Sequence, residues 1–154
     1  MKGTTSLPSN YPANLYETDY MQWLIATVNQ LRHQEYAHVD WDNLIEEIED
    51  MGKRERRSLK SNLVILLLHL LKWHYQPTQR TGSWAGSIVE HRRRIHEALK
   101  DSPSLAPYLA DVLAEAYQDA RKQAGAETML PDETFPQACE FELAQVMDEN
   151  FPLG

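Results

Sequence analysis

Two rows of carboxylates in this sequence of 154 residues have the residue type and spacing to bind a metal ion. If the segments are helical, each row shares one face, and its oxygens can converge on a hard cation such as Mg²⁺. The rows are Glu46, Glu49 and Asp50, and then Asp111, Glu115 and Asp119. Two such rows facing each other would suit a Mg²⁺-dependent phosphohydrolase or nuclease. We favour the alternative, a solvated helix face whose carboxylates pair with Lys53 and Arg54.

A second group combines an arginine with imidazole and indole rings. Its members are His69, Trp73, Arg80 and Trp84. A guanidinium offers a planar fork of donors to a phosphate or carboxylate, and the rings would exclude water, so the group is a candidate anion site. In the structural alternative, which we favour, Arg80 bonds carbonyls left open at a helix end and Trp84 packs against Trp73. His69 would then donate to a backbone oxygen.

Two runs of basic residues could lie side by side on neighbouring helices. The candidates for partner binding are Arg54, Arg57, Arg92 and Arg93. Such a patch would bind an anionic partner, either a protein or a nucleic acid. The same arginines could instead pair with the acidic stretches 40–50 or 127–149 and form ion-pair networks only.

The overall charge narrows the possible functions. The chain has 15 Lys and Arg against 23 Asp and Glu, a formal net charge of -8, which argues against a general nucleic-acid coat or a binder of anionic membranes. A single cysteine excludes an internal disulfide. The polar N-terminus has no signal-peptide pattern, and the longest apolar run, 63–68, is too short to span a membrane. We therefore expect a cytoplasmic protein with no membrane partner.

Helical periodicity dominates the elements that would position these side chains. We predict helices over about 17–34, 41–75, 83–100, 102–125 and 140–148, with Ser83 capping the third. In the second, an apolar stripe continues without a phase shift through Leu44, Ile48, Met51, Leu59, Leu63, Leu66, Leu70 and Trp73. In the first, the expected inward stripe is Leu24, Val28 and Leu31, widened by Trp23 and Tyr20. Leu67 and Leu71 lie beside the main stripe, where exposure would allow a homo-oligomer.

The predicted fold is an all-α antiparallel bundle of about five helices, built on one long helical hairpin. Residues 1–14 are expected to be a flexible arm, and residues 15–154 a single helical domain.

Several motifs occur in an order that resembles a known family. They are LIEEIEDMGKRERR from Leu44, HLLKWHYQP from His69, DSPSL from Asp101, and Phe135-Pro136 followed by Cys139. The chain resembles the bacterial domain-of-unknown-function family 29 over roughly residues 15–153. The resemblance implies an α-helical protein without an assigned biochemical role. Two positions depart from the family pattern, Met129 where glycine is usual and Glu140 where proline is usual.

These observations favour a non-enzymatic interaction module that binds an anionic partner, protein or nucleic acid, through Arg-rich helix faces. The alternative is the Mg²⁺-dependent phosphohydrolase or nuclease that uses the acidic rows. No cofactor is predicted apart from Mg²⁺ in that alternative.

Overall fold

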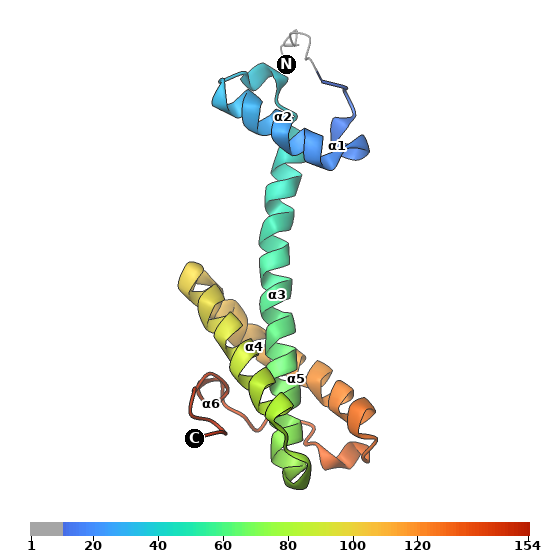
Figure 1. Cartoon of the computed structure of the whole chain (residues 1–154), viewed down its shortest axis with the longest axis vertical. Coiled ribbons are helices and arrows are strands. Elements are labelled where there is room, and N and C mark those ends of the chain that lie inside the picture. The colour runs from blue at the N-terminus through green and yellow to red at the C-terminus, as the bar shows by residue number, and fades with distance from the viewer. Residues whose placement is uncertain (1–10) are drawn as a thin grey trace. The chain divides into compact units, whose positions relative to one another are not determined.

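Every regular element in the described part of the chain, residues 11–154 of a computed structural model, is a helix. Residues 11–154 form six α-helices, α1 (Leu15–Thr18), α2 (Tyr20–Arg32), α3 (Trp41–Tyr75), α4 (Gly82–Asp101), α5 (Ala106–Thr128) and α6 (Leu143–Val146) (Figure 1). Four short 3₁₀ turns connect them, namely η1 (Tyr36–His38), η2 (Pro77–Gln79), η3 (Pro103–Leu105) and η4 (Asp132–Thr134). The prediction of an all-α fold is confirmed. None of these helices is long and apolar enough to cross a lipid bilayer.

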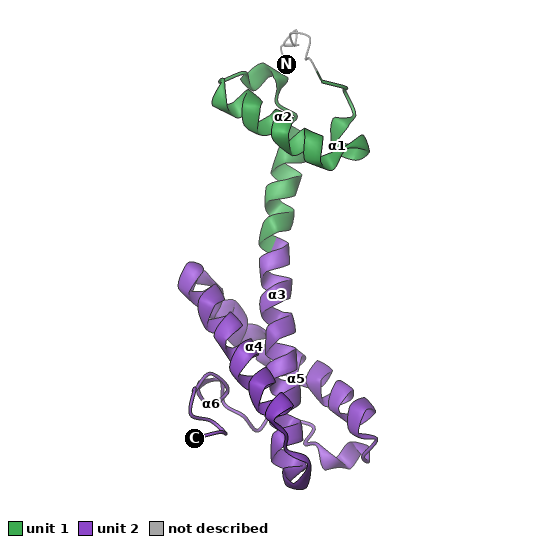
Figure 2. Cartoon of the chain, in the orientation of Figure 1, with its two compact units in different colours: residues 1–52 green, residues 53–154 purple. Residues whose placement is uncertain are grey.

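The chain divides into two compact units, Met1–Gly52 and Lys53–Gly154, which we call unit 1 and unit 2 (Figure 2). The boundary falls inside α3, which is helical through Gly52 and has the predicted bounds. The single domain expected over 15–154 stays a prediction. Residues 1–10 of the expected flexible arm lie outside the described residues, whereas Tyr11 packs against the small core of unit 1.

The core of unit 2 covers α3 on more than one side. The predicted stripe residues Leu59, Leu63, Leu66 and Leu70 are buried, together with side chains of α4, α5 and the C-terminal segment. A helix that is apolar around most of its circumference must be enclosed by other elements. Leu67 and Leu71 are therefore buried too, and their expected exposure is wrong. A homo-oligomer stays a prediction, but Leu67 and Leu71, being buried, no longer support it.

The C-terminal segment of unit 2 has little regular structure, so side chains of the helices satisfy its backbone. Arg121 of α5 donates from Nε to the carbonyl oxygen of Phe135 at 3.0 Å and from Nη2 to that of Asp132 at 2.9 Å. The Tyr117 hydroxyl donates to the carbonyl of Pro136. The helix expected over 140–148 is only the four residues of α6.

Unit 1 has a much smaller core. It consists of the buried side chains of Leu15, Trp23 and Ala26, and Leu24 of α2 and Leu44 of α3 pack against it. Beside this core, the Tyr16 hydroxyl donates to Oε2 of the buried Glu47 at 2.9 Å. That hydrogen bond and burial together raise the pKa of Tyr16 to about 12. A second phenol, Tyr20, donates to the other carboxylate oxygen.

The apolar stripes expected to form the core of unit 1 are mostly exposed. The buried face of α2 is formed by Trp23, Ala26, Thr27 and Gln30, of which only Trp23 belongs to the predicted stripe. Val28 of that stripe is exposed, and Leu24 and Leu31 are half-buried. In α3, Ile48 is 58% exposed and Met51 is 54% exposed. The inward assignments of Val28, Ile48 and Met51 are therefore wrong, whereas Leu24 and Leu44 pack against the core as expected.

Several helix ends differ from the expected positions. Asp19 ends α1 and caps α2 by accepting from the amide of Gln22, so the helix expected over 17–34 is two helices. Thr81, and not Ser83, caps α4. The last long helix continues past the expected end near residue 125 and stops at Met129, whose φ of 56° is left-handed. The departure of Met129 from glycine thus falls where glycine is favoured.

Candidate functional site

Arg92 lies in the buried stripe of α4. Ile88, Arg92 and Ile95 are spaced four and three residues apart and are all buried. A charged residue in such a stripe is unusual, because an ion loses much of its hydration when buried. Only 2% of the surface of Arg92 is exposed, and this burial lowers the pKa of its guanidinium, which the negative charges of Asp148 and Glu149 partly oppose.

The Arg92 guanidinium is only partly satisfied. Its Nε donates to the carbonyl oxygen of Val146 at 2.8 Å, which fixes the C-terminal segment against α4. Its Nη2 is buried and has no hydrogen-bond partner among the residues that the structure describes. No carboxylate in residues 11–154 lies within ion-pair distance of it. An unpaired charged donor of this kind costs free energy unless an acceptor reaches it.

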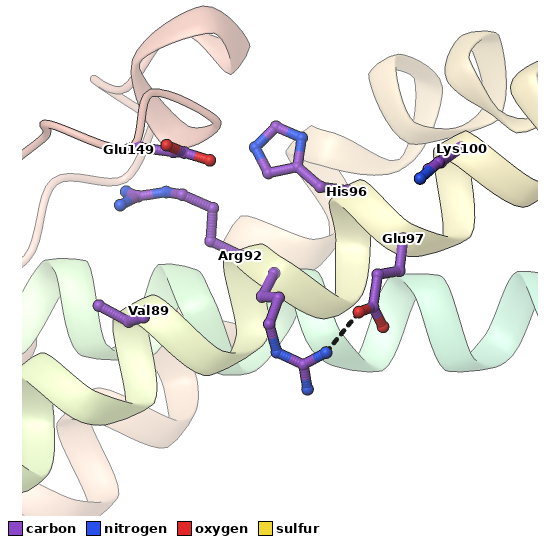
Figure 3. A pocket seen from close by; sticks show the side chains of 7 residues that line it. Val89, Arg92, His96, Glu97, Lys100 and Glu149 are labelled. Carbon is purple, nitrogen blue, oxygen red and sulfur yellow. Dashed lines mark hydrogen bonds and ion pairs between the residues drawn. The ribbon is translucent and has the colours of Figure 1, made fainter.

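A cavity of about 520 Å³ opens beside Arg92. One side of α4 and one residue after α6 line it: Val89, Arg92, Arg93, His96, Glu97, Lys100 and Glu149. Figure 3 shows Val89 and Lys100 at opposite ends of this stretch of α4, with Arg92 beside Glu149. The α4 residues follow the three- and four-residue spacing of one helix face, so α4 alone positions most of the site.

The cations of this cavity differ in how far they are neutralised. Arg93 pairs with Glu97 at 2.6 Å and with Glu90 at 2.7 Å. Hydrogen bonds from Arg93 and Arg94 lower the pKa of Glu90 to about 2. Lys100, like Arg92, has no ion-pair partner among the described side chains. The cavity therefore keeps two cations, Arg92 and Lys100, that form no ion pair within residues 11–154, although the negative charges of Asp148 and Glu149 act on Arg92.

The four arginines predicted to bind a partner do not line one cavity. Arg92 and Arg93 line the α4 cavity, and Arg57 lines a separate, open depression of about 490 Å³ between α3 and α5. Arg54, also on α3, lines neither. The continuous patch stays a prediction. Sequence reasoning missed Lys100 as a site residue, although Arg92, His96 and Lys100 repeat every four residues and would share a face.

The turn between α3 and α4 brings Arg80 close to Trp73, and Lys72 close to Trp84. Arg80 donates from Nε to the carbonyl oxygen of Trp73 at 2.8 Å, and its guanidinium carbon lies 4.9 Å from the centre of the Trp73 ring. The ammonium nitrogen of Lys72 lies 4.7 Å from the centre of the Trp84 ring. Arg80 thus bonds an open carbonyl at the end of α3, as the structural alternative expects. Anion binding at this turn stays a prediction.

His69 also contacts the backbone. Its Nδ1 lies 2.8 Å from the carbonyl oxygen of Ile65, which can only accept, so Nδ1 carries the proton. The Ser87 hydroxyl is 3.3 Å from the same nitrogen. Burial lowers the pKa of His69. These contacts also agree with the structural alternative.

The two acidic rows belong to different units. Glu46, Glu49 and Asp50 are in unit 1, and Asp111, Glu115 and Asp119 are in unit 2. In the second row, Lys60 of α3 pairs with Glu115 at 2.8 Å and with Asp119 at 3.3 Å. A cation of α3 thus neutralises part of this row, and the pairing expected with Lys53 and Arg54 stays a prediction. Within residues 11–154, no group of three or more His, Cys, Asp or Glu side chains is placed to hold a metal ion.

The fold and the cavity define an all-α protein with a partly satisfied, buried arginine beside a surface cavity. The chain matches the family described as "Domain of unknown function DUF29" over residues 15–152, nearly its whole length, and it belongs to this family. The resemblance inferred from the motifs is confirmed. No curated protein and no solved structure matches the chain. The family description names no activity.

Proposed function

We propose that this protein is a non-enzymatic interaction module whose α4 cavity binds an anionic side chain of a partner protein. One observation carries the proposal: Arg92 is buried beside the cavity with Nη2 unpartnered. A carboxylate bound in the cavity beside Arg92 would accept a hydrogen bond from a guanidinium that is already desolvated. Hydrogen bonds to charged groups contribute about 1.5–3 kcal/mol each.

The lining of the cavity favours a single anionic group over a nucleic-acid backbone. Glu97 and Glu149 line the same cavity and would repel a chain of phosphates. Unit 2 has 13 Lys and Arg and 14 Asp and Glu, a net charge of -1, whereas nucleic-acid binding depends on a strongly positive surface. Val89 adds an apolar wall, which suits an acidic residue flanked by apolar ones in a peptide.

A Mg²⁺-dependent phosphohydrolase or nuclease is the other function considered. Its second acidic row already pairs with Lys60, and no specific contact within residues 11–154 favours it. We therefore do not propose this activity.

An NMR titration of the full-length ¹⁵N-labelled protein tests the proposal. The probes are acetate, inorganic phosphate, a Glu- and Leu-containing peptide and a single-stranded oligonucleotide. We expect saturable shifts at the Arg92 Nε–H and at the amides of His96 and Lys100, with the acidic peptide binding more tightly than either small anion. Tighter binding of the oligonucleotide, with a strong salt dependence, would make the partner a nucleic acid and contradict the proposal.

Three variants identify the site. Arg92→Gln and Lys100→Gln should each weaken peptide binding by roughly tenfold, the effect of losing one hydrogen bond to a charged group. Lys100 is exposed, so its variant stays informative even if Arg92→Gln fails to fold. The matched control is Arg94→Gln, which removes the same charge from α4 outside the cavity lining. Equal affinities for all three variants would place the peptide elsewhere.

A further inference from the structure

Unit 1 contains most of the large apolar side chains that are exposed in residues 11–154. Of the 11 such exposed side chains in residues 11–154, nine lie between Tyr20 and Met51 and two lie in unit 2. Single exposed apolar residues are normal on soluble proteins, but a concentration of them marks an interaction surface. The concentration of exposed apolar side chains in unit 1 therefore indicates an interaction surface.

These side chains form rows with helical spacing. On α2 the row is Met21, Ile25 and Val28, and on α3 it is Trp41, Ile45 and Ile48. Both rows have the spacing i, i+4, i+7, so each follows one face of its helix. We call them the α2 row and the α3 row. A face with this spacing accommodates a partner helix, whose side chains fit between the turns.

The two rows border the same small core. Leu24 of α2 and Leu44 of α3 both pack against the buried cluster around Trp23. Met21 and Val28 are three and four residues from Leu24, and the α3 row has residues three and four positions from Leu44. Each row is thus the next strip of surface on its helix beside that core.

A row of carboxylates accompanies the α3 row. Asp42, Glu46 and Glu49 are exposed, and each directly follows a member of the α3 row in the sequence. Since successive helical residues are about 100° apart, the acidic row runs parallel to the apolar row on the neighbouring face. Residues 11–52 contain nine Asp and Glu and one Arg, a net charge of -8.

We propose that unit 1 binds a basic amphipathic helix of a partner protein. The apolar face of that helix would cover the α2 and α3 rows, and its Lys or Arg side chains would pair with the acidic row. A second copy of unit 1 is disfavoured as the occupant, because like-charged surfaces repel on close approach. The proposal is independent of anion binding at the α4 cavity.

Fluorescence anisotropy with the full-length protein tests this surface. The probe is a labelled helical peptide of about 18 residues, or five turns, with Leu at i, i+4 and i+7 and Lys in the adjacent row. A second peptide with Glu in place of Lys serves as its comparison. We expect saturable binding of the Lys peptide and at least about tenfold weaker binding of the Glu peptide. Raising the salt from about 0.05 M to about 0.5 M should weaken binding of the Lys peptide.

Two double variants remove the apolar row and the acidic row separately. Ile45→Ser with Ile48→Ser, and Glu46→Gln with Glu49→Gln, should each weaken binding of the Lys peptide at least about tenfold, as expected for central contacts. Both pairs are exposed, and circular dichroism verifies that helicity is kept.

The controls are variants of exposed residues in unit 2. Val89→Ser removes an apolar side chain, and Asp111→Asn with Glu133→Gln removes two carboxylates. Lys100→Gln alters the α4 cavity alone. All of these should bind the Lys peptide as the unaltered protein does.

Three outcomes would overturn the proposal. They are the absence of saturable binding, equal binding of the Lys and Glu peptides, and unchanged affinity in both unit 1 variants. Sedimentation that shows a dimer, dissociated by the Ile45 and Ile48 substitutions, would make a second copy the occupant and likewise reject a basic partner helix.

Discussion

The two units share one helix but use it differently. In unit 2, Leu63 and Leu66 of α3 are enclosed by α4, α5 and the C-terminal segment. In unit 1, Ile48 and Met51 follow the same period and are more than half exposed. Helical periodicity fixes which side chains share a face, and only neighbouring elements decide whether that face is covered. The contrast teaches that an amphipathic stripe predicts a contact without saying whether the contact lies within the chain.

The net charge also differs between the two units. Unit 1 contains two Lys and Arg and nine Asp and Glu, a net charge of -7, whereas unit 2 contains 13 and 14, a net charge of -1. The sum is the -8 of the whole chain. The overall charge is therefore nearly all a property of unit 1. Unit 2 balances its charges, many of them through local pairs such as those of Arg93 with Glu90 and Glu97.

The largest effect that would distinguish the units comes from shortening one stripe residue in each. Leu66→Ala removes buried methyl groups and should lower the free energy of unfolding of unit 2 by about 2–5 kcal/mol. Ile48→Ala removes exposed ones and should change the stability of unit 1 by no more than about 0.5 kcal/mol. Urea denaturation monitored by hydrogen exchange of peptides from each unit measures both. Similar losses in the two variants would mean that the unit 1 stripe is buried after all.

Glu47 tests whether unit 1 depends on its own small core. Glu47→Ala leaves the hydroxyls of Tyr16 and Tyr20 without their buried acceptor and should destabilise unit 1 by about 1–3 kcal/mol. Faster amide exchange in 15–32 with unchanged exchange in 82–128 is the expected pattern. Equal acceleration in both stretches would instead show that the units unfold together, as a single domain requires.

Within residues 11–154, each unit has one left-handed, non-glycine residue after a long helix, and these positions offer a matched pair of stabilising changes. Gln34 has φ of 58° and Met129 has φ of 56°. The left-handed conformation costs a side-chain-bearing residue roughly 1–2 kcal/mol. Gln34→Gly and Met129→Gly should each raise the stability of their own unit by about 1 kcal/mol in thermal or urea denaturation. Alanine at the same positions should give no such gain, because it retains the Cβ atom.

The smallest expected effect is a pH dependence confined to unit 2. Burial lowers the pKa of His69, so the unfolded chain binds this proton more readily than the folded chain. Stability from this group is present above the unfolded pKa of about 6.5 and is lost as the pH falls through the lower folded value. The ring is only half-buried, so the loss should stay below about 1 kcal/mol.

His69→Gln should reduce the change in the urea midpoint of unit 2 between about pH 7.5 and pH 5.5. The charges that act on His69 from neighbouring positions are those of Lys72, Glu127 and His91. An unchanged pH profile would assign any acid sensitivity to those groups or to the other histidines. His33→Gln, in unit 1, is the control and should leave the profile of unit 2 unaltered.

Local chemistry made much of the fold predictable. Asp40 precedes α3 and accepts from Asn43, and Pro77 follows its end, so the bounds of the longest helix could be read directly. The cover of α3 could not, because it depends on how distant segments pack. Leu67 and Val28 show the error in opposite directions, since the expected exposed residue is buried and the expected buried one is exposed.

The candidate site was predictable only in part. Arg92 and Arg93 stand out as a basic run, and the spacing of Arg92, His96 and Lys100 fits one helix face. The features that give Arg92 its chemistry are burial and the bond to the carbonyl of Val146, 54 residues away in the sequence. A contact at that separation is set by the path of the irregular C-terminal segment, which has no periodic pattern to read.

The placement of the indole rings gives each half of the molecule its own optical reporter. Unit 1 holds the buried Trp23 and the exposed Trp41, and unit 2 holds Trp73 and Trp84 at the turn after α3. Replacing Trp41, Trp73 and Trp84 by phenylalanine would leave an emission spectrum that depends on Trp23 alone. A red shift of this emission during denaturation would then report when water reaches the small core of unit 1, independently of changes around Arg92.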